Sequence, residues 1–292
     1  MKNYNFPLVS LCIPTYNGAK FIGEALDAAI NQTYNNIEII ISDDDSNDDT
    51  LTIINDKLKN SKISYYIYNH KPNGIGANWN NCIRYARGEY IKFLFQDDLM
   101  RPDCIEKMIE LAITNNNIGL VYCKRTILHD ANNLEHKAWI NYGGILHKKW
   151  FAIDVAAGVL DGKKYLSDLY LMNDNPLNKI GEPTAVLLKK RCVDKIGLFD
   201  EHLKQTLDID YWYRLMKYYK IGFIDEELVS FRLHYDQASS VNKRNQINEG
   251  ELLNKKFYKT ISWYFHPKKR WKFFKRYSSV GNLARYIKRV CS

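Results

Sequence analysis

Short apolar runs alternate with amphipathic segments along the first 123 residues. The runs have strand length and are rich in β-branched side chains, whereas the segments between them repeat their apolar residues every three or four positions, as helices do. The predicted strands are residues 8–13, 37–42, 63–68, 89–95 and 118–123, and the predicted helices are residues 19–32, 50–59, 79–86 and 102–115. Buried strands that alternate with helices are typical of a parallel sheet covered by helices. The pattern therefore predicts an α/β fold with a mostly parallel central sheet.

The pattern is weaker in the second half of the chain. Residues 124–180 contain many aromatic residues with little periodicity, so we expect irregular structure with short helices there. Strands at residues 184–188 and 221–231 and helices at residues 192–196 and 208–219 are predicted beyond this region.

Polar clusters follow three of the predicted strands, at residues 15–17, 43–45 and 97–98. Ligands of open parallel sheets bind beyond the carboxyl ends of the strands, so we expect these clusters to share one rim. Carboxylates in such a place suit a hard divalent cation that keeps some waters and bridges substrate phosphates. Taken singly, each cluster is better explained as a solvated turn or a helix cap. The chain has neither the glycine-rich fingerprint of a dinucleotide site nor a P-loop.

The composition narrows the class of protein. The chain is 46% hydrophobic and 26% charged, which excludes a disordered or low-complexity protein. It has no apolar run of the ~18–20 residues that a membrane-spanning helix needs, and its N-terminus lacks the apolar core of a signal peptide. The six cysteines are far apart and form no C-x-x-C pair, which favours thiols in a reducing compartment. We therefore expect a cytoplasmic protein.

The positive charge is concentrated at the C-terminal end. The net charge is +9, but residues 255–292 contain 12 Lys or Arg and no Asp or Glu, which leaves a net charge of −3 on residues 1–254. Ten aromatic residues are interleaved with these basic residues. The combination predicts a helical extension that binds an anionic membrane surface. RNA binding, or simple packing of the helix on the rest of the protein, would suit the same composition.

Several segments carry a resemblance to a known family. In chain order they are Ile13-Pro14-Thr15-Tyr16-Asn17-Gly18, Gln32-Thr33-Tyr34, Asp43-Asp44-Asp45-Ser46, Ala86-Arg87-Gly88-Glu89-Tyr90-Ile91 and Gln96-Asp97-Asp98. The chain resembles family-2 glycosyltransferases of the bacterial surface-polysaccharide type, which have the Rossmann-like GT-A fold. The resemblance implies a GT-A domain over residues 1–240, with a nucleotide-binding half at 1–123 and an acceptor-binding half at 124–240. Residues 241–292 would form the basic, aromatic, helical extension.

The resemblance implies a nucleotide site on the predicted rim. The implied nucleotide-binding residues are Pro14, Thr15, Tyr16, Asn17, Asp44, Gln96, Asp97 and Arg232. Thr15 and Tyr16 lie where the family holds the base, and Tyr16 would be free to stack on it. Asp44 stands where a carboxylate accepts the imide N–H of uracil, which implies a UDP-sugar donor.

The resemblance also implies a divalent metal, Mn²⁺ or Mg²⁺. Asp97 takes the place of the metal-binding aspartate of the D-x-D motif, whose first aspartate is replaced here by Phe95. Asp98 would either assist the metal through a water or shape the turn. His234 is a second candidate ligand, with a packed or surface histidine as the alternative. Arg232 would pair with a phosphate.

The general base is implied at Asp208, which matches the aspartate of the family's E-D pair. Leu207 replaces the glutamate of that pair, and an apolar neighbour would raise the pKa of the base toward neutrality. The alternative is that Asp208 only caps the helix that follows.

The resemblance thus implies an inverting, metal-dependent hexosyl- or N-acetylhexosaminyl-transferase. The expected acceptor is a glycan or polyprenol-linked glycan, the expected location is the inner face of the cell membrane, and no nucleic-acid partner is expected. Two alternatives stay open. A metal-dependent nucleotidyltransferase would need a basic loop after the first strand, which the chain offers only weakly. A non-catalytic nucleic-acid-binding protein would use the basic tail but leave Asp44, Asp97 and Asp208 unexplained.

Overall fold

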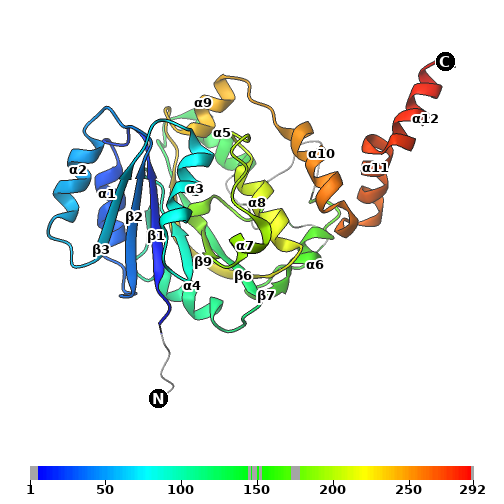
Figure 1. Ribbon diagram of the computed structural model, residues 1–292. Helices are drawn as coiled ribbons and strands as arrows, with labels where there is room; N and C mark the ends of the chain where they lie inside the picture. Colours follow the sequence, from blue (N-terminus) through cyan, green and yellow to red (C-terminus); the bar gives the residue numbers. More distant parts are fainter. Residues whose placement is uncertain (1–5, 144–145, 147–149, 151–152, 172–177, 291–292) are drawn as a thin grey trace.

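The computed structural model describes residues 6–143, 146, 150, 153–171 and 178–290 (Figure 1). Their centre is one nine-stranded sheet with strand order β3-β2-β1-β4-β8-β6-β9-β5, in which β7 also pairs with β9. The strands are β1 (Val9–Thr15), β2 (Ile37–Asp43), β3 (Ser64–Asn69), β4 (Tyr90–Phe93), β5 (Leu99–Met100), β6 (Ile118–Leu128), β7 (Gly158–Asp161), β8 (Val186–Lys189) and β9 (Lys220–Arg232).

Helices flank this sheet and form most of the described part of the C-terminal extension. They are α1 (Ile22–Ile30), α2 (Thr50–Leu58), α3 (Ile75–Tyr85), α4 (Cys104–Ala112), α5 (Leu134–Gly143), α6 (Gly162–Leu166), α7 (Cys192–Ile196), α8 (Leu207–Met216), α9 (Ala238–Arg244), α10 (Gly250–Thr260), α11 (Pro267–Tyr277) and α12 (Ser279–Val290), with short 3-10 helices η2 (Pro183–Ala185) and η3 (Ser262–Tyr264). Within the described part of the chain, no helix has the length and apolar character that crossing a membrane requires.

The sheet is mostly parallel, as predicted. Strands β1, β2, β3 and β4 run parallel to one another, and β6 and β9 run in the same direction. Strand β8 lies between β4 and β6 and is antiparallel to both, while β5 and β7 are antiparallel to β9. The carboxyl ends of β1, β2, β4 and β9 therefore lie at one rim, where the polar clusters were expected.

Alternate residues of the central strands enter two different cores. In β1, Val9, Leu11 and Ile13 pack in a buried cluster with residues of α1, α2 and α4. Cys12 points to the opposite face, where residues of α3, α8 and α10 form the second cluster. All seven residues of β1 and of β2 are buried, which explains why these strands read as continuous apolar runs rather than as alternating ones.

The structure is more regular than expected between residues 124 and 180. Strand β6 continues to Leu128 because it pairs with β9 along its length, and α5, β7 and α6 follow it. Residues 144–145, 147–149, 151–152 and 172–177 of this region lie outside the described part. Helix α3 also begins four residues earlier than predicted, after Gly74, whose φ of 86° suits glycine. The domain limits proposed at residues 123 and 240 fall inside β6 and α9.

The C-terminal extension has two parts with different surroundings. Leu253 and Phe257 of α10, followed by Ile261 and Phe265, are buried in the same cluster as residues of α8. Helices α11 and α12 project from the body of the molecule, as the red end of the ribbon in Figure 1 shows. Phe273 is the residue of α11 that is buried against the body. The first part of the extension thus completes the core, whereas most side chains of residues 267–283 are exposed or half-buried.

Candidate active site

The loop after β1 is fixed by a glutamine from the loop after β4. Gln96 accepts a hydrogen bond from the backbone N–H of Tyr16 at 2.9 Å and donates one to its carbonyl at 3.0 Å. Gly18 lies so close that a Cβ there would meet the Gln96 Oε1 at 2.3 Å. The amide of Gln96 is therefore engaged with the chain itself, and the ring of Tyr16 stands 52% exposed on the rim.

The other residues of this loop tie β1 to β2. Thr15 is buried and its hydroxyl donates to Asp43 Oδ1 at 2.8 Å, and Pro14 is buried within the strand below it. Asn17, at a φ of 47°, accepts from the backbone N–H of Asn47 at 2.9 Å. Pro14 and Thr15 thus support the rim from inside the sheet, while Tyr16 and Asn17 form its surface.

Asp44 is nearly buried beside the segment that leads into α3. Its Oδ1 accepts the backbone N–H of Asn73 at 2.8 Å and lies 3.3 Å from Nδ1 of His70, and its Oδ2 accepts the N–H of Gly74 at 3.1 Å. A carboxylate oxygen can accept two hydrogen bonds. Asp44 therefore clamps this segment and keeps acceptor capacity on Oδ2 for a ligand.

Asp97 and His234 meet at the ends of β4 and β9. The Nε2 of His234 lies 2.8 Å from Asp97 Oδ2, and each side chain is about one-fifth exposed. Among the described residues, no group of three or more His, Cys, Asp or Glu side chains is arranged to hold a metal. One carboxylate and one imidazole fit a divalent cation that takes its other ligands from water and phosphate oxygens.

Two neighbours shape this end of the rim. Arg232 donates from Nε to the carbonyl of Asp97 at 2.8 Å and from Nη2 to Glu24 at 2.6 Å. Asp98 is buried and accepts the Thr184 hydroxyl at 2.7 Å and the backbone N–H of Arg232 at 3.0 Å. Burial, with a contribution from Asp97, raises the pKa of Asp98 to about 8. Asp98 therefore joins the loop after β4 to η2 and to the end of β9, which favours the turn-shaping role over a contact with the metal.

Asp208 lies in the first turn of α8 and is partly buried. Its Oδ2 accepts from the amide of Asn178 at 2.6 Å, and its Oδ1 accepts the N–H of Ile209 at 2.7 Å. Burial of the carboxyl raises its pKa to about 7, in the direction predicted from Leu207. The N-cap of α8 is Thr206, so Asp208 does not occupy the capping position.

Similarity to known proteins shows the family to which this chain belongs. The family model described as glycosyl transferase family 2 matches residues 10–161, just over half of the chain. The chain belongs to glycosyltransferase family 2. An uncharacterized glycosyltransferase of Rickettsia typhi is 33% identical over 264 residues, covering 89% of the chain and 74% of the relative. A chondroitin synthase of Escherichia coli is 36% identical over 128 residues, covering 44% of the chain and 18% of that enzyme.

Solved structures confirm the GT-A fold of this glycosyltransferase. S. aureus TarS 1-349 in complex with UDP-GlcNAc matches it with a TM-score of 0.61 at 18% identity, over 88% of this chain and 65% of that one. The mannosyltransferase PcManGT from Pyrobaculum calidifontis, in complex with GDP-Man and Mn²⁺, matches with a TM-score of 0.58 at 15% identity, over 88% and 72%. The chain spans about two thirds of the length of the TarS fragment.

Sequence analysis missed a buried arginine of this glycosyltransferase. Arg125 on β6 forms a close ion pair with Glu182, and burial lowers its pKa to about 10. Its charge lowers the pKa of both Asp98 and Asp208, although burial outweighs it at each. The sequence did not indicate the role of Arg125, because the residue lies in a stretch without clear periodicity and its partner Glu182 is more than fifty residues away in the chain.

One segment of the chain connects the two ends of the site. Asn178 binds Asp208, Glu182 binds Arg125, and Thr184 binds Asp98. Residues 178–184 thus run from the expected base to the rim that carries Asp97. The predicted nucleotide and metal residues thus lie at the rim, and Asp208 is linked to the rim through residues 178–184. Pro14, Thr15 and Gln96 lie beneath or beside the rim and support its loops.

Proposed function

We propose that this glycosyltransferase moves a hexosyl or N-acetylhexosaminyl group from a UDP-sugar to a hydroxyl of a glycan or polyprenol-linked glycan, with inversion. The observation that carries the proposal is Asp208. An aspartate whose pKa is raised to about 7 is suited to take a proton at neutral pH, and residues 178–184 join it to the rim with Asp97.

The proposed step is a single displacement. Asp208 accepts the proton of the acceptor hydroxyl as its oxygen forms a bond to the anomeric carbon. The bond between that carbon and the diphosphate oxygen breaks at the same time, and UDP leaves with the electron pair. Attack from the face opposite the diphosphate inverts the anomeric configuration.

The proposed donor contacts lie on the rim. Tyr16 stacks on the base, and Asp44 accepts the uracil imide N–H with the free capacity of Oδ2. Asp97 and His234 hold Mn²⁺ or Mg²⁺, which when bound neutralises charge on the departing diphosphate. The TarS structures with UDP-GlcNAc and with UDP support a UDP donor, and the mannosyltransferase complex with Mn²⁺ supports the metal.

Calorimetry of UDP and GDP, with and without Mn²⁺, tests this site. We expect UDP to bind more tightly with Mn²⁺, and Asp97→Asn to abolish that gain. Asp103→Asn is the matched control, because Asp103 pairs with Arg101 and Lys107 near the same loop but not with His234. Tighter binding of GDP than of UDP would contradict the role of Asp44. An unchanged metal dependence in Asp97→Asn would remove Asp97 from the site.

We further propose that α11 and α12 attach the enzyme to the inner face of the cell membrane, where a polyprenol-linked acceptor would lie. Residues 267–290 contain nine Lys or Arg and no acidic residue. Trp263 and Trp271 are 76% and 58% exposed, and Trp271 stacks on Phe274 at 5.6 Å. Exposed aromatic rings among basic residues suit an anionic lipid surface. Phe265, one of the ten aromatic residues of the extension that were expected to serve the membrane surface, is buried and belongs to the core instead.

Sedimentation with phosphatidylglycerol vesicles tests the attachment. We expect the full chain to sediment with these vesicles and not with phosphatidylcholine vesicles. The double variant Trp263→Ser with Trp271→Ser should weaken the part of the binding that persists at high salt. Truncation near residue 254 is not a suitable test, since it would remove Phe257 and Phe265 from the core. Tight binding to RNA without binding to vesicles would overturn the proposal.

A further inference from the structure

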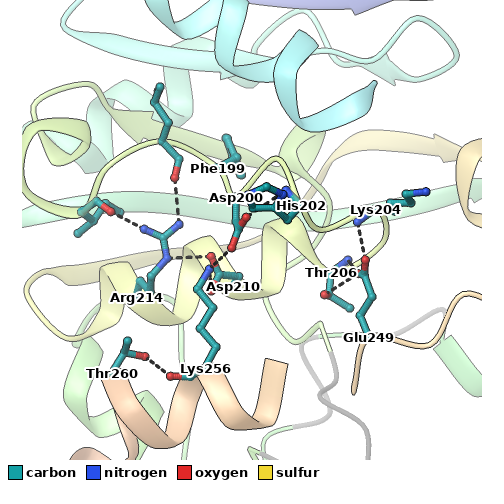
Figure 2. A network of polar contacts seen from close by, with 12 residues as sticks. Phe199, Asp200, His202, Lys204, Thr206, Asp210, Arg214, Glu249, Lys256 and Thr260 are labelled. Carbon is teal, nitrogen blue, oxygen red and sulfur yellow. Dashed lines mark hydrogen bonds and ion pairs between the residues drawn. The ribbon is translucent and has the colours of Figure 1, made fainter. Parts of the chain in front are cut away.

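The turn that leads into α8 is held by the C-terminal extension. Glu249, at the start of α10, accepts the backbone N–H groups of Lys204, Gln205 and Thr206 at 2.6, 3.0 and 3.0 Å, and the Thr206 hydroxyl at 2.9 Å (Figure 2). Asn242 of α9 donates to the carbonyl of Lys204 at 2.9 Å. One carboxylate thus binds four donors of the segment that immediately precedes the helix with Asp208.

A second contact reaches the helix itself. Lys256 of α10 lies 2.8 Å from Oδ1 of Asp210 and 2.7 Å from Oδ2 of Asp200 (Figure 2). Asp210 is fully buried, and its Oδ2 accepts from Nε of Arg214 at 2.8 Å. Because Asp210 lies two residues after Asp208, Lys256 fixes α8 close to the expected base.

The packing between these polar contacts keeps α8 and α10 together. The ring of Phe257 lies 5.5 Å from the ring of Tyr213, between centroids, and both side chains are buried. A carboxylate that binds several N–H groups near a helix N-terminus is also favoured by the helix dipole. The polar contacts of Glu249 and Lys256 and the aromatic contact of Phe257 thus join the start of the C-terminal extension to the first two turns of α8 and to the segment before it.

We propose that Glu249 and Lys256 are positioning residues for glycosyl transfer, which hold α8 so that the Asp208 carboxylate meets the acceptor hydroxyl. The inference rests on the proposed function of Asp208. It gives Glu249 and Lys256, at the beginning of the C-terminal extension, a role in orienting α8, whereas α11 and α12 are proposed to serve attachment.

Loss of this hold would change the surroundings of Asp208. Arg125 from β6, Tyr213 from α8 and the amide of Asn178 face its carboxyl. A loosened α8 would admit water among these groups, and the pKa of Asp208 would fall toward its ordinary value. A misplacement of about 1 Å in a reacting group can cost about 100-fold in rate.

Three variants of the full chain test the inference. Glu249→Gln keeps the shape of the side chain but has one acceptor oxygen instead of two, so it cannot accept all four hydrogen bonds. Lys256→Met keeps the length of the side chain but removes its charge. Glu251→Gln is the matched control, since Glu251 lies on the same helix and binds Arg276 and Tyr277 of α11 rather than the turn before α8. The assay uses the nucleotide sugar that is hydrolysed fastest among UDP-GlcNAc, UDP-glucose, UDP-galactose and GDP-mannose.

We expect kcat to fall about 10- to 100-fold in Glu249→Gln and Lys256→Met. KM for the donor should stay unchanged, and the acidic limb of the pH profile should move to lower pH. Glu251→Gln should match the parent enzyme in all three. If Glu249→Gln and Lys256→Met lower only the melting temperature and leave kcat and the pH profile unchanged, the contacts are merely structural and the inference is wrong.

A milder variant and a direct measurement of the pKa of Asp208 test the same contacts independently. Should Glu249→Gln not fold, Thr206→Val removes only the hydroxyl contact, and it must shift kcat and the pH profile in the same direction by less. NMR of ¹³C-labelled aspartate, assigned with Asp208→Asn, reports the pKa of Asp208 without any substrate. If Asp208→Asn itself retains full activity, the proposed function fails. If Asp208→Asn loses activity while Glu249→Gln and Lys256→Met behave like the parent enzyme, the positioning role fails and the proposed function stands.

Discussion

The rim that would bind the donor and the region around Asp208 are built in different ways. Tyr16, Asp44 and Asp97 follow β1, β2 and β4, all within the first 100 residues, and short loops hold them in place. Asp208 depends instead on Asn178, which lies thirty residues earlier, and on the charge of Arg125 from β6. One region comes from consecutive strand ends, and the other is assembled from distant segments.

This difference matches the chemistry proposed for each region. Asp97 is partly open to solvent beside His234 and Arg232, where a cation and phosphates would have access. Asp208 is desolvated, which weakens its acidity and suits it to receive a proton. Under the proposed function, carboxylates of one type would thus take two roles from their surroundings: the carboxylate at an open strand end would bind a cation, and the one at a desolvated helix end would accept a proton.

The largest expected effect separates the two roles. Asp208→Asn keeps the size of the side chain but cannot accept the proton, so turnover should fall by about 10²- to 10⁴-fold while UDP affinity in Mn²⁺ is retained. Stopped assays of donor turnover and calorimetry measure the two quantities. Asp225→Asn on β9, which removes an exposed carboxylate paired with Lys124, should change neither. Loss of UDP binding in Asp208→Asn would place this residue in the donor site and remove the distinction.

The second prediction concerns the support of the base. Arg125→Met leaves the buried Oε2 of the half-buried Glu182 without its partner, so the free energy of unfolding should fall in urea titrations, by about 3 kcal/mol at most because the carboxylate is 20% exposed. The double variant Arg125→Met with Glu182→Leu removes both charges and should regain most of that loss. A double variant that is no more stable than Arg125→Met would show that Arg125 acts through Asp98 and Asp208 rather than through Glu182.

The pH dependence should have opposite signs for activity and stability. Asp208 must be ionised to act, so kcat should rise with pH and level off above about 7. A carboxyl whose pKa is raised on folding binds more protons when folded between pH 3.8 and about 7. Its contribution to stability is therefore complete below this window and is lost as pH rises through 7.

Urea titrations between pH 4 and 8.5 measure this contribution. Asp208→Asn should make stability less dependent on pH without removing the dependence, because Asp98, with a pKa of about 8, contributes in the same direction. An identical pH dependence of stability in the variant and the parent would show that the Asp208 carboxyl is not desolvated.

The sequence predicted the two regions with different success, for a physical reason. The strand-end residues were placed correctly because a parallel sheet brings consecutive carboxyl ends to one rim, whatever the details of the loops. The pairing of β6 with β9, and with it Arg125, was missed because long-range pairing leaves no mark on local periodicity.

The supporting roles were also beyond the sequence. The contact of Gln96 with the nucleotide stays a prediction, but the hydrogen bonds of its amide to the backbone of Tyr16 were not predicted, since only the folded loop brings residues 80 positions apart together. The burial of Phe257 and Phe265 could not be distinguished from membrane insertion by composition, because both environments select aromatic residues.

The smallest expected effect concerns the exposed ring of the donor rim. Among the described contacts, the side chain of Tyr16 forms no hydrogen bond, and its ring is 52% exposed. Tyr16→Ala should therefore leave the melting temperature nearly unchanged. Stacking of a base on an aromatic ring contributes about 1–3 kcal/mol, so UDP affinity should fall by roughly 5- to 150-fold. Tyr16→Phe keeps the ring and should bind UDP as the parent does. Because stacking does not select a base, Tyr16→Ala should weaken UDP and CDP equally, whereas Asp44→Asn should weaken UDP alone. Selective loss of UDP in Tyr16→Ala would instead assign recognition of uracil to the Tyr16 loop.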